Sequence, residues 1–192
     1  MLILIVGLSI FLGAHSVRVF ADDWRAQQIA QRGEKTWKGL FTAVSLLGFA
    51  LIVIGYGAAR QQPVVIWMPP VGMAHIASLL TLIAFIFLAA ASVPNNAIKA
   101  KLGHPMILGV KVWALAHLLS NGMLADVILF GAFLLWAILD FRAARRRQPA
   151  AAMAIVPTTA GTATAVIAGV VVWAVFAFYL HKLVIGVAPM GG

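Results

Sequence analysis

The fold depends on one apolar stretch, residues 103–141, which reads GHPMILGVKVWALAHLLSNGMLADVILFGAFLLWAILDF. As a single α-helix these 39 residues would be about 58 Å long, nearly twice the roughly 30 Å thickness of a hydrocarbon layer. Ser120, Asn121 and Gly122 interrupt the stretch, and Asn and Gly tolerate the left-handed backbone that tight turns and helix ends need. We therefore predict two membrane-spanning helices here, joined by a turn at residues 120–122.

The rest of the chain has the same apolar character. Of its 192 residues, 63% are apolar and 10% are charged, whereas soluble domains are about 45–50% apolar and roughly 25% charged. Apolar runs of helical length also occupy residues 1–20, 39–58, 71–92 and 164–187. The sequence therefore predicts an all-α integral membrane protein, a six-transmembrane-helix bundle in which residues 1–192 form a single transmembrane domain embedded in the lipid bilayer.

The basic residues predict the orientation of this bundle. With six spans, eleven Lys and Arg residues fall on one side of the membrane and two, Arg60 and Lys182, on the other. The positive-inside rule makes the basic side cytoplasmic, so both termini are periplasmic and the protein is a multi-pass protein of the bacterial inner membrane. Residues 142–163 are then a cytoplasmic linker before the final helix, 164–187. The net charge of +9 is explained by topology, so we expect no nucleic acid as a partner.

Composition narrows the chemistry. The chain has no cysteine, which excludes disulfides, thiolate-bound zinc, iron–sulfur clusters and cysteine nucleophiles. It has five acidic residues and no phosphate-binding loop, HExxH or GxSxG motif, so mechanisms based on paired carboxylates are disfavoured. Any metal chemistry therefore has to use histidine.

Five histidines are present, and all of them lie within the apolar runs, His104 at the very start of one. Ionisable side chains at membrane depth are costly and usually face a bundle interior or cavity, although each is also compatible with a hydrogen-bonded packing role. Counting residues from the helix ends places His75, His117 and His181 in the outer third of the layer, and His15 and His104 in the inner third. Two imidazoles at one depth on facing helices can ligate a haem iron. We therefore predict haem b bound by His117 and His75, with His181 in reserve.

Other polar residues accompany the histidines. Lys111 lies in the middle of its helix, seven residues from His104, and is expected to face the interior with Asp126 or a haem propionate as its counter-ion. The alternative is a lysine in a wet gap with no chemical task. Asn121 and Asp126 are placed to line the outer mouth of the same polar stripe. Arg60, at the outer end of the second span, either meets a propionate or is a plain helix-end anchor.

Several motifs resemble the NnrU family over residues 1–141. They are GAHSVR at residues 13–18, GY at 55–56, WMPP at 67–70, HPM at 104–106 and KVWALAHLLSNG at 111–122. The resemblance implies a bacterial inner-membrane protein associated with denitrification, which supports nitrite and nitric oxide reductase function. The family is similar to plastid zeta-carotene isomerase, a membrane enzyme whose b-type haem iron isomerises a cis double bond. The resemblance makes His117 a haem ligand, and the partner ligand of that enzyme falls nearest His15. Because our depth assignment separates these two by about 15 Å along the membrane normal, we rank His75 ahead of His15.

Two classes of function follow from these observations. In the first, a haem protein binds or senses a small ligand such as nitric oxide, or catalyses redox-dependent isomerisation of an apolar small molecule. In the second, a non-catalytic assembly factor packs beside denitrification enzymes through a small-residue face, Gly161, Ala165 and Gly169, which we otherwise interpret as bundle packing. A third and weaker hypothesis is a degenerate membrane methyltransferase relative. GHPMI at residues 103–107 resembles the Arg-His-Pro-x-Tyr string of those enzymes but lacks its arginine and tyrosine.

Overall fold

A computed structural model of the chain describes residues 1–147 and 155–189, and this part consists of helices joined by loops, with one isolated β-bridge. Five helical segments are long and apolar enough to cross a membrane: α1 (Leu2–Phe20), α3 (Glu34–Arg60), α4 (Met73–Ser92), α7 (Leu124–Arg147) and the segment Thr159–Ile185. That last segment consists of α8 (Thr159–Val175), the π-helical turn η2 (Phe176–Leu180) and α9 (His181–Ile185). The apolar helix α6 (Pro105–Ser120) is shorter, at 16 residues, and α2 (Asp22–Arg32) and α5 (Ala97–Leu102) are short connecting helices.

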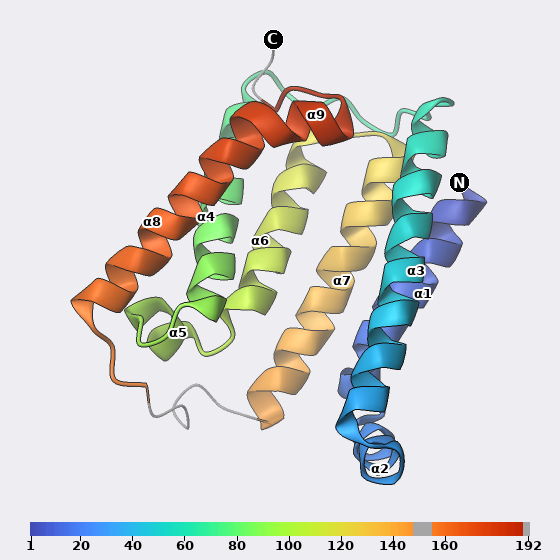
Figure 1. Cartoon of the computed structure of the whole chain (residues 1–192). Helices are drawn as coiled ribbons and strands as arrows, with labels where there is room; N and C mark the ends of the chain where they lie inside the picture. Colours follow the sequence, from blue (N-terminus) through green and yellow to red (C-terminus); the bar gives the residue numbers. More distant parts are fainter. Residues whose placement is uncertain (148–154, 190–192) are drawn as a thin grey trace.

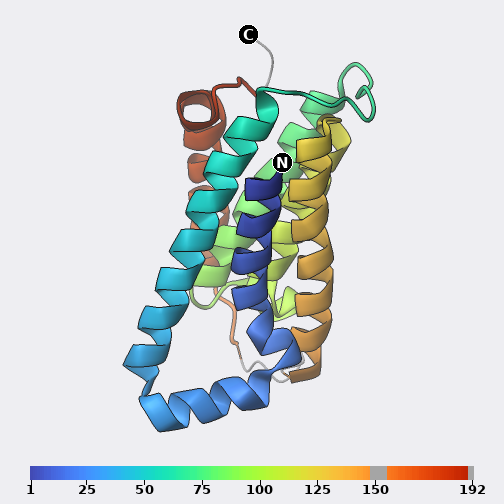
Figure 2. The same ribbon diagram turned by 90° about the vertical axis from the view of Figure 1, so that its right-hand side faces the viewer.

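Successive long helices run in opposite directions, so that the N-terminus and α9 lie at one end of the bundle (Figure 1). The helices α2 and α5 lie at the other end, where α2 crosses from the end of α1 to the start of α3 (Figure 2). The contacts between helices follow the order α3, α1, α7, α6, α4, α8. The all-helical membrane fold predicted from the sequence is confirmed in this form.

The helix α2 differs from the expectation from the sequence, which placed no helix between the apolar runs at residues 1–20 and 39–58. Two aspartates lie in its first turn, where the helix dipole favours negative charge, and Arg32 lies in its last. None of its residues is buried. Its Trp24 ring meets the edge of Trp37 at a centroid distance of 5.7 Å, which ties α2 to the start of α3. Hydrophobic periodicity does not mark this helix, because an 11-residue polar helix needs the ends of two longer helices to support it.

The turn between α6 and α7 lies where it was predicted, but its backbone differs from the prediction. Asn121 is extended, with φ −131° and ψ 127°, and the glycines with positive φ are Gly33, Gly72, Gly103 and Gly186. Gly122 has another role. Its carbonyl accepts hydrogen bonds from the amides of Ile66 (2.8 Å) and Trp67 (3.2 Å), and a Cβ on it would collide with the Trp67 carbonyl. The left-handed turn expected here was therefore wrong, because a distant loop holds this turn by close backbone contact.

Glycines allow two pairs of helices to pack closely. A Cβ at Gly55 of α3 would overlap the backbone of Leu4 in α1. On α8, a Cβ at Gly169 would overlap the backbone of Ile86 in α4, and Ala165, on the same face, is 0% exposed. Small residues let helices in membranes approach at backbone distance. The bundle-packing interpretation of the small-residue face on the last helix is thus confirmed.

The predicted linker, 142–163, is shorter in the structure. The helix α7 continues through Arg147, and α8 begins at Thr159, while residues 148–154 lie outside the described part. The start of α8 is fixed locally, because the Thr158 hydroxyl accepts a hydrogen bond from the Gly161 amide (3.0 Å). The Thr158 amide also donates to the carbonyl of Asn95 (2.8 Å), which joins α8 to the corner between α4 and α5.

Candidate functional site

A cavity of about 310 Å³ lies between α4, α6 and the segment α8–α9, and we call it the α9 cavity. Its volume is at the lower end of the range of about 300–1,000 Å³ that is typical of small-molecule sites. Its lining combines six aromatic or imidazole rings with small residues, and it has a polar rim at the end of α6. The lining residues include Phe85, Trp113, His117, Ser120, Asn121, Trp173, Phe176 and His181.

His117 enters this cavity from the last turn of α6 and is held rigidly. Its Nδ1 lies 2.9 Å from the carbonyl oxygen of Trp113, one helical turn earlier. A carbonyl oxygen can only accept, so Nδ1 carries the proton and Nε2 keeps its lone pair. The ring stacks on Phe130 of α7 with a centroid distance of 4.4 Å and an interplanar angle of 28°. Packing and hydrogen bonding therefore fix both the tautomer and the orientation of this imidazole.

His181 enters the same cavity from the opposite wall. It follows directly after the π-helical turn η2, and such turns shift the helical register and are frequent at functional sites. The helix ends at Gly186, whose φ of +81° lets the chain turn back, and the Val187 carbonyl then accepts from His181 Nδ1 at 2.7 Å. Like His117, His181 thus has Nδ1 tied to the backbone, with Nε2 left as its basic nitrogen.

The other predicted histidines lie elsewhere. His75 is exposed near the start of α4 and does not line the α9 cavity. His15 and His104 both line a second cavity, of about 730 Å³, at the α2 end of the bundle, which we call the α2 cavity. His15 Nδ1 donates to the Phe11 carbonyl (2.7 Å). The structure therefore brings His117 together with His181 and His15 together with His104, and it leaves His75 outside both cavities.

The polar residues predicted around the histidines have other partners. Lys111 lies over the Phe141 ring, with Nζ 4.7 Å from its centroid, and His104 meets the same ring at 6.3 Å, as their seven-residue spacing predicts. Asp126 is only 6% exposed and accepts a hydrogen bond from the Tyr56 hydroxyl (2.5 Å), so it is not the counter-ion of Lys111 that we expected. Side chains in a helix lean toward its N-terminus, which directs Lys111 toward the α2 end and away from Asp126.

Two further residues make side-chain hydrogen bonds to backbone carbonyls at the α9 end. Arg60 Nη1 donates to the Ile185 carbonyl (2.9 Å), so it joins the end of α3 to the end of α9, which corresponds to its helix-end alternative. The side-chain amide of Asn121 donates to the His117 carbonyl (2.9 Å) and thereby closes the last turn of α6 beneath the imidazole. Both residues support the walls of the α9 cavity.

The donor set of the α9 cavity limits the metal chemistry that it can support. Among residues 1–147 and 155–189, no group of three or more His, Asp or Glu side chains is placed to hold a metal ion. A bis-histidine haem needs two imidazoles because the porphyrin supplies the other four ligands. Two imidazoles with basic Nε2 atoms and aromatic walls suit that cofactor better than a bare metal ion.

Sequence reasoning missed two features of this site and also the partner of Asp126. Tyr56 was named only within the GY motif at residues 55–56 and was given no role, although a tyrosine inside an apolar run is a polar signal that could have marked it. Phe130 as the stacking partner of His117 and the π-helical turn before His181 leave no trace in hydrophobic periodicity. They depend on contacts between helices.

Apolar helices of spanning length, together with an imidazole pair in a cavity between them, define a multi-pass helical membrane protein with a candidate cofactor or small-molecule site. The chain belongs to the NnrU family, because the family described as "NnrU protein" matches residues 3–189. The match confirms the resemblance seen in the motifs and extends it over α8 and α9. No curated protein and no solved structure matches the chain.

Proposed function

We propose that this NnrU-family protein binds haem b in the α9 cavity, with the imidazoles of His117 and His181 as the protein ligands. One observation carries the proposal: His117 on α6 and His181 on α9 line one cavity, and a backbone carbonyl holds the Nδ1 of each. Metal-binding histidines usually donate their second ring N–H in this way, because the bond fixes the tautomer and makes the other nitrogen a better ligand. Haem bound here would supply a redox-active iron.

The remaining walls suit the same cofactor. Trp113 and Phe176, one from each histidine-bearing wall, give the apolar aromatic surface that a porphyrin ring needs. The Trp173 indole N–H donates to the Thr81 hydroxyl (3.2 Å), so this donor already has its hydrogen-bond partner within the protein. Ser120 and Asn121 form a polar rim that can meet propionates. His181 replaces His75 as the partner of His117 in this proposal, because His75 is exposed outside the cavity.

The chain itself would control access to the iron. If both imidazoles held a haem iron, a gas or substrate could bind only where one of them had left. His117 is stacked on Phe130 within the bundle, whereas His181 is in the last, five-residue helix and its tether is an exposed carbonyl. Of the two imidazoles, that of His181 would therefore be the one that leaves. Such a site would bind or sense nitric oxide, or isomerise an apolar small molecule, in support of nitrite and nitric oxide reductase function.

We also propose that the chain crosses the bacterial inner membrane six times, with both termini in the periplasm. The 16 residues of α6 reach about 24 Å, and α6 lies alongside α4 and α7 over its length (Figure 1). The α2 end holds Arg18, Lys99 and most of the other basic residues, which makes it the cytoplasmic end under the positive-inside rule.

The absorption spectrum of the purified protein tests the haem proposal. The protein is produced in haem-replete cells, purified in detergent, and measured as oxidised and dithionite-reduced samples. We expect a Soret band with sharp α and β bands on reduction, abolished or shifted in His117→Ala and His181→Ala. His75→Ala is the matched control and should leave the spectrum unchanged. A colourless wild-type protein would overturn the proposal and favour a non-catalytic assembly factor, and a spectrum that depends on His75 and not His181 would refute the ligand pair.

A growth experiment tests the physiological part separately. A strain lacking the gene should grow poorly by nitrite respiration, and the wild-type gene should restore growth. If His117→Ala restores growth as well as the wild type does, the role in denitrification does not depend on haem.

A further inference from the structure

The α2 cavity has a composition that the proposed function does not use. Its volume of about 730 Å³ is more than twice that of the α9 cavity, and it lies between α1, α2, α3, α6 and α7. Five cationic side chains line it, against two carboxylates. The cations are Arg18, Arg25, Lys38, Lys99 and Arg147, and the carboxylates are Glu34 and Asp140.

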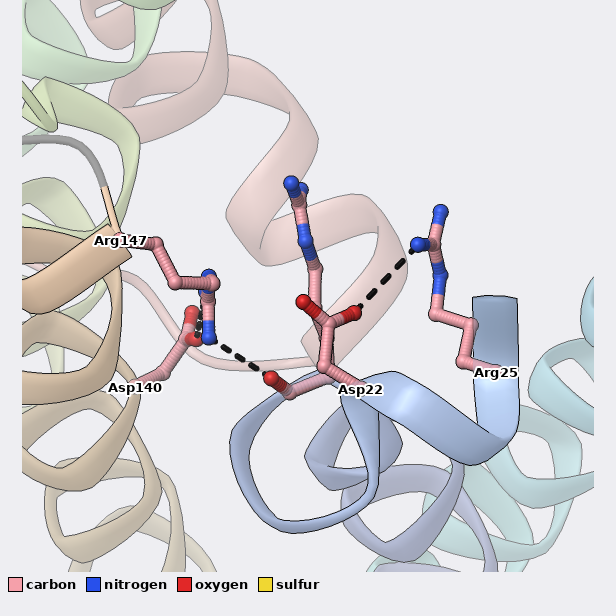
Figure 3. Close-up of polar contacts among 5 residues, drawn as sticks. Asp22, Arg25, Asp140 and Arg147 are labelled. Atoms are coloured by element: carbon pink, nitrogen blue, oxygen red, sulfur yellow. Dashed lines mark hydrogen bonds and ion pairs between the residues drawn. The ribbon is translucent and has the colours of Figure 1, made fainter. Parts of the chain in front are cut away.

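The carboxylates are already engaged with part of this positive charge. Asp140 pairs with Arg147 at 3.7 Å, and Arg147 also donates to the Arg18 carbonyl (2.7 Å), so that this guanidinium joins the end of α7 to the end of α1. Figure 3 shows these contacts of Arg147 beside the Asp22–Arg25 pair, whose closest atoms are 3.4 Å apart. The other carboxylate that lines the cavity, Glu34, pairs with Lys38 at 2.8 Å. A guanidinium has five N–H donors and an ammonium has three, so each of these ion pairs uses only part of that capacity. The cavity therefore keeps a positive surplus.

The lining of the same cavity also has an aromatic part. It contains Trp37, Phe41 and Trp136, and His15 lies against the last two, with ring centroids at 4.9 Å from Phe41 and 6.0 Å from Trp136. The indole nitrogen of Trp136 is buried and has no hydrogen-bond partner in the part of the chain that the structure describes. Buried donors without a partner are uncommon and call for an acceptor. We call Trp37, Phe41 and Trp136 together the aromatic wall.

The positive-inside rule alone explains basic residues at this end of the bundle, but it does not explain this arrangement. Topology requires cations in the connecting segments at this end, as exposed Arg32 and Lys101 illustrate. It does not require cations from five helices to line one cavity together with three aromatic rings. Cationic groups and aromatic surface in one cavity match a ligand that has both an anionic group and an apolar body.

We propose that the α2 cavity binds a phosphate-bearing amphiphile. The phosphate lies among Arg18, Arg25 and Lys38, which come from α1, α2 and α3, and the apolar body lies along the aromatic wall. Phosphate is favoured over carboxylate because it has more acceptor oxygens for several cations to share. The same chemistry occurs in an anionic phospholipid of the cytoplasmic leaflet and in a soluble phosphate ester.

The test compares two pairs of variants with the same change in charge. Arg18→Gln with Arg25→Gln removes two cations that line the cavity. Arg32→Gln with Lys101→Gln is the matched control, because it removes two exposed cations from the same end without touching the cavity. Each protein in detergent is titrated with short-chain phosphatidylglycerol, phosphatidylcholine or glycerol phosphate, and binding is followed by thermal stabilisation and by native mass spectrometry. Lys38→Gln is a second cavity variant that does not endanger folding, because its side chain is 72% exposed.

We expect wild type and control to retain phosphatidylglycerol over phosphatidylcholine, and the cavity pair to bind it roughly tenfold or more weakly, as loss of charged hydrogen bonds implies. Lys38→Gln should weaken binding in the same direction. Glycerol phosphate that stabilises as strongly as the lipid would identify a soluble phosphate ester as the ligand, whereas a requirement for the chains would identify the lipid. The proposal is overturned if phosphatidylcholine is retained equally, or if both variant pairs lose binding alike, which would be surface electrostatics. The haem spectrum is not involved, so this result and that of the haem test are independent.

Discussion

The hydrogen bond between Tyr56 and Asp126 joins α3 to α7, and its removal should destabilise the bundle. The Tyr56 hydroxyl donates to Asp126 Oδ1 over 2.5 Å, and the other carboxylate oxygen accepts from the Met123 amide at 3.3 Å. Asp126 is 6% exposed, so water cannot replace a lost donor freely. Tyr56→Phe removes one hydroxyl oxygen and leaves this buried carboxylate with one fewer partner.

The size of the effect follows from the charge of the acceptor. Hydrogen bonds to charged groups contribute about 1.5–3 kcal/mol, whereas neutral side-chain bonds in membranes average about 0.6 kcal/mol. For a chain of this length, 1 kcal/mol corresponds to roughly 2–4 °C in the unfolding midpoint. Tyr56→Phe should therefore lower the unfolding midpoint by about 3–12 °C. A decrease in the upper half of this range would show that water does not reach Asp126 in the variant.

Thermal unfolding of detergent-solubilised protein, followed by far-UV circular dichroism, measures this midpoint. The chain supplies its own control, because its second tyrosine, Tyr179, is 73% exposed. Tyr179→Phe removes the same hydroxyl from a surface position and should shift the midpoint by less than about 1 °C, since exposed substitutions have small effects. Equal midpoints for the two variants would refute the assignment of Asp126 as a buried, Tyr56-dependent acceptor.

Three other perturbations test the packing and the topology. Gly55→Ala should destabilise the protein by about 1–3 kcal/mol, because the added Cβ overlaps the backbone of α1. Gly57→Ala has open space around it and should be neutral or slightly stabilising. Denaturant titration of the two variants measures this difference. Gly169→Leu should push α8 away from α4 and weaken haem retention together with thermal stability; unchanged retention would place the cofactor elsewhere. Because the chain has no cysteine, a single cysteine introduced as Gln62→Cys or Arg146→Cys can be labelled uniquely in intact cells with an impermeant maleimide. Only Gln62→Cys should react. Labelling of both variants from outside would contradict six spans.

The apolar helices could be predicted because membrane solubility imposes a strong compositional signal on every one of them. The turn at residues 120–122 was located for the same reason. Its conformation was not, because residues 64–67, far away in the sequence, pair with Gly122 and its neighbours. The polar helix α2 was also missed, since its stability depends on the ends of α1 and α3 rather than on its own 11 residues.

The candidate site was predictable in part. His117 was selected from its depth and motif, and it lines the α9 cavity. The ranking of His75 over His181 rested on counting residues along ideal helices. Such counting gives depth and cannot give direction around the helix axis, and the π-helical turn before His181 changes that direction. Asp126 illustrates the same limit, because its partner Tyr56 is 70 residues away in the sequence.

The position of α1 between α3 and α7 has a consequence for biosynthesis. When the ribosome has released α3 into the membrane, the face of α1 that will meet α7 still borders lipid. At about 5–20 residues per second, the residues from Arg60 to Arg147 take roughly 4–17 s to be translated. During that interval the first hairpin exists without its permanent neighbour, and the seam between the two halves of the protein closes only when α7 has been inserted.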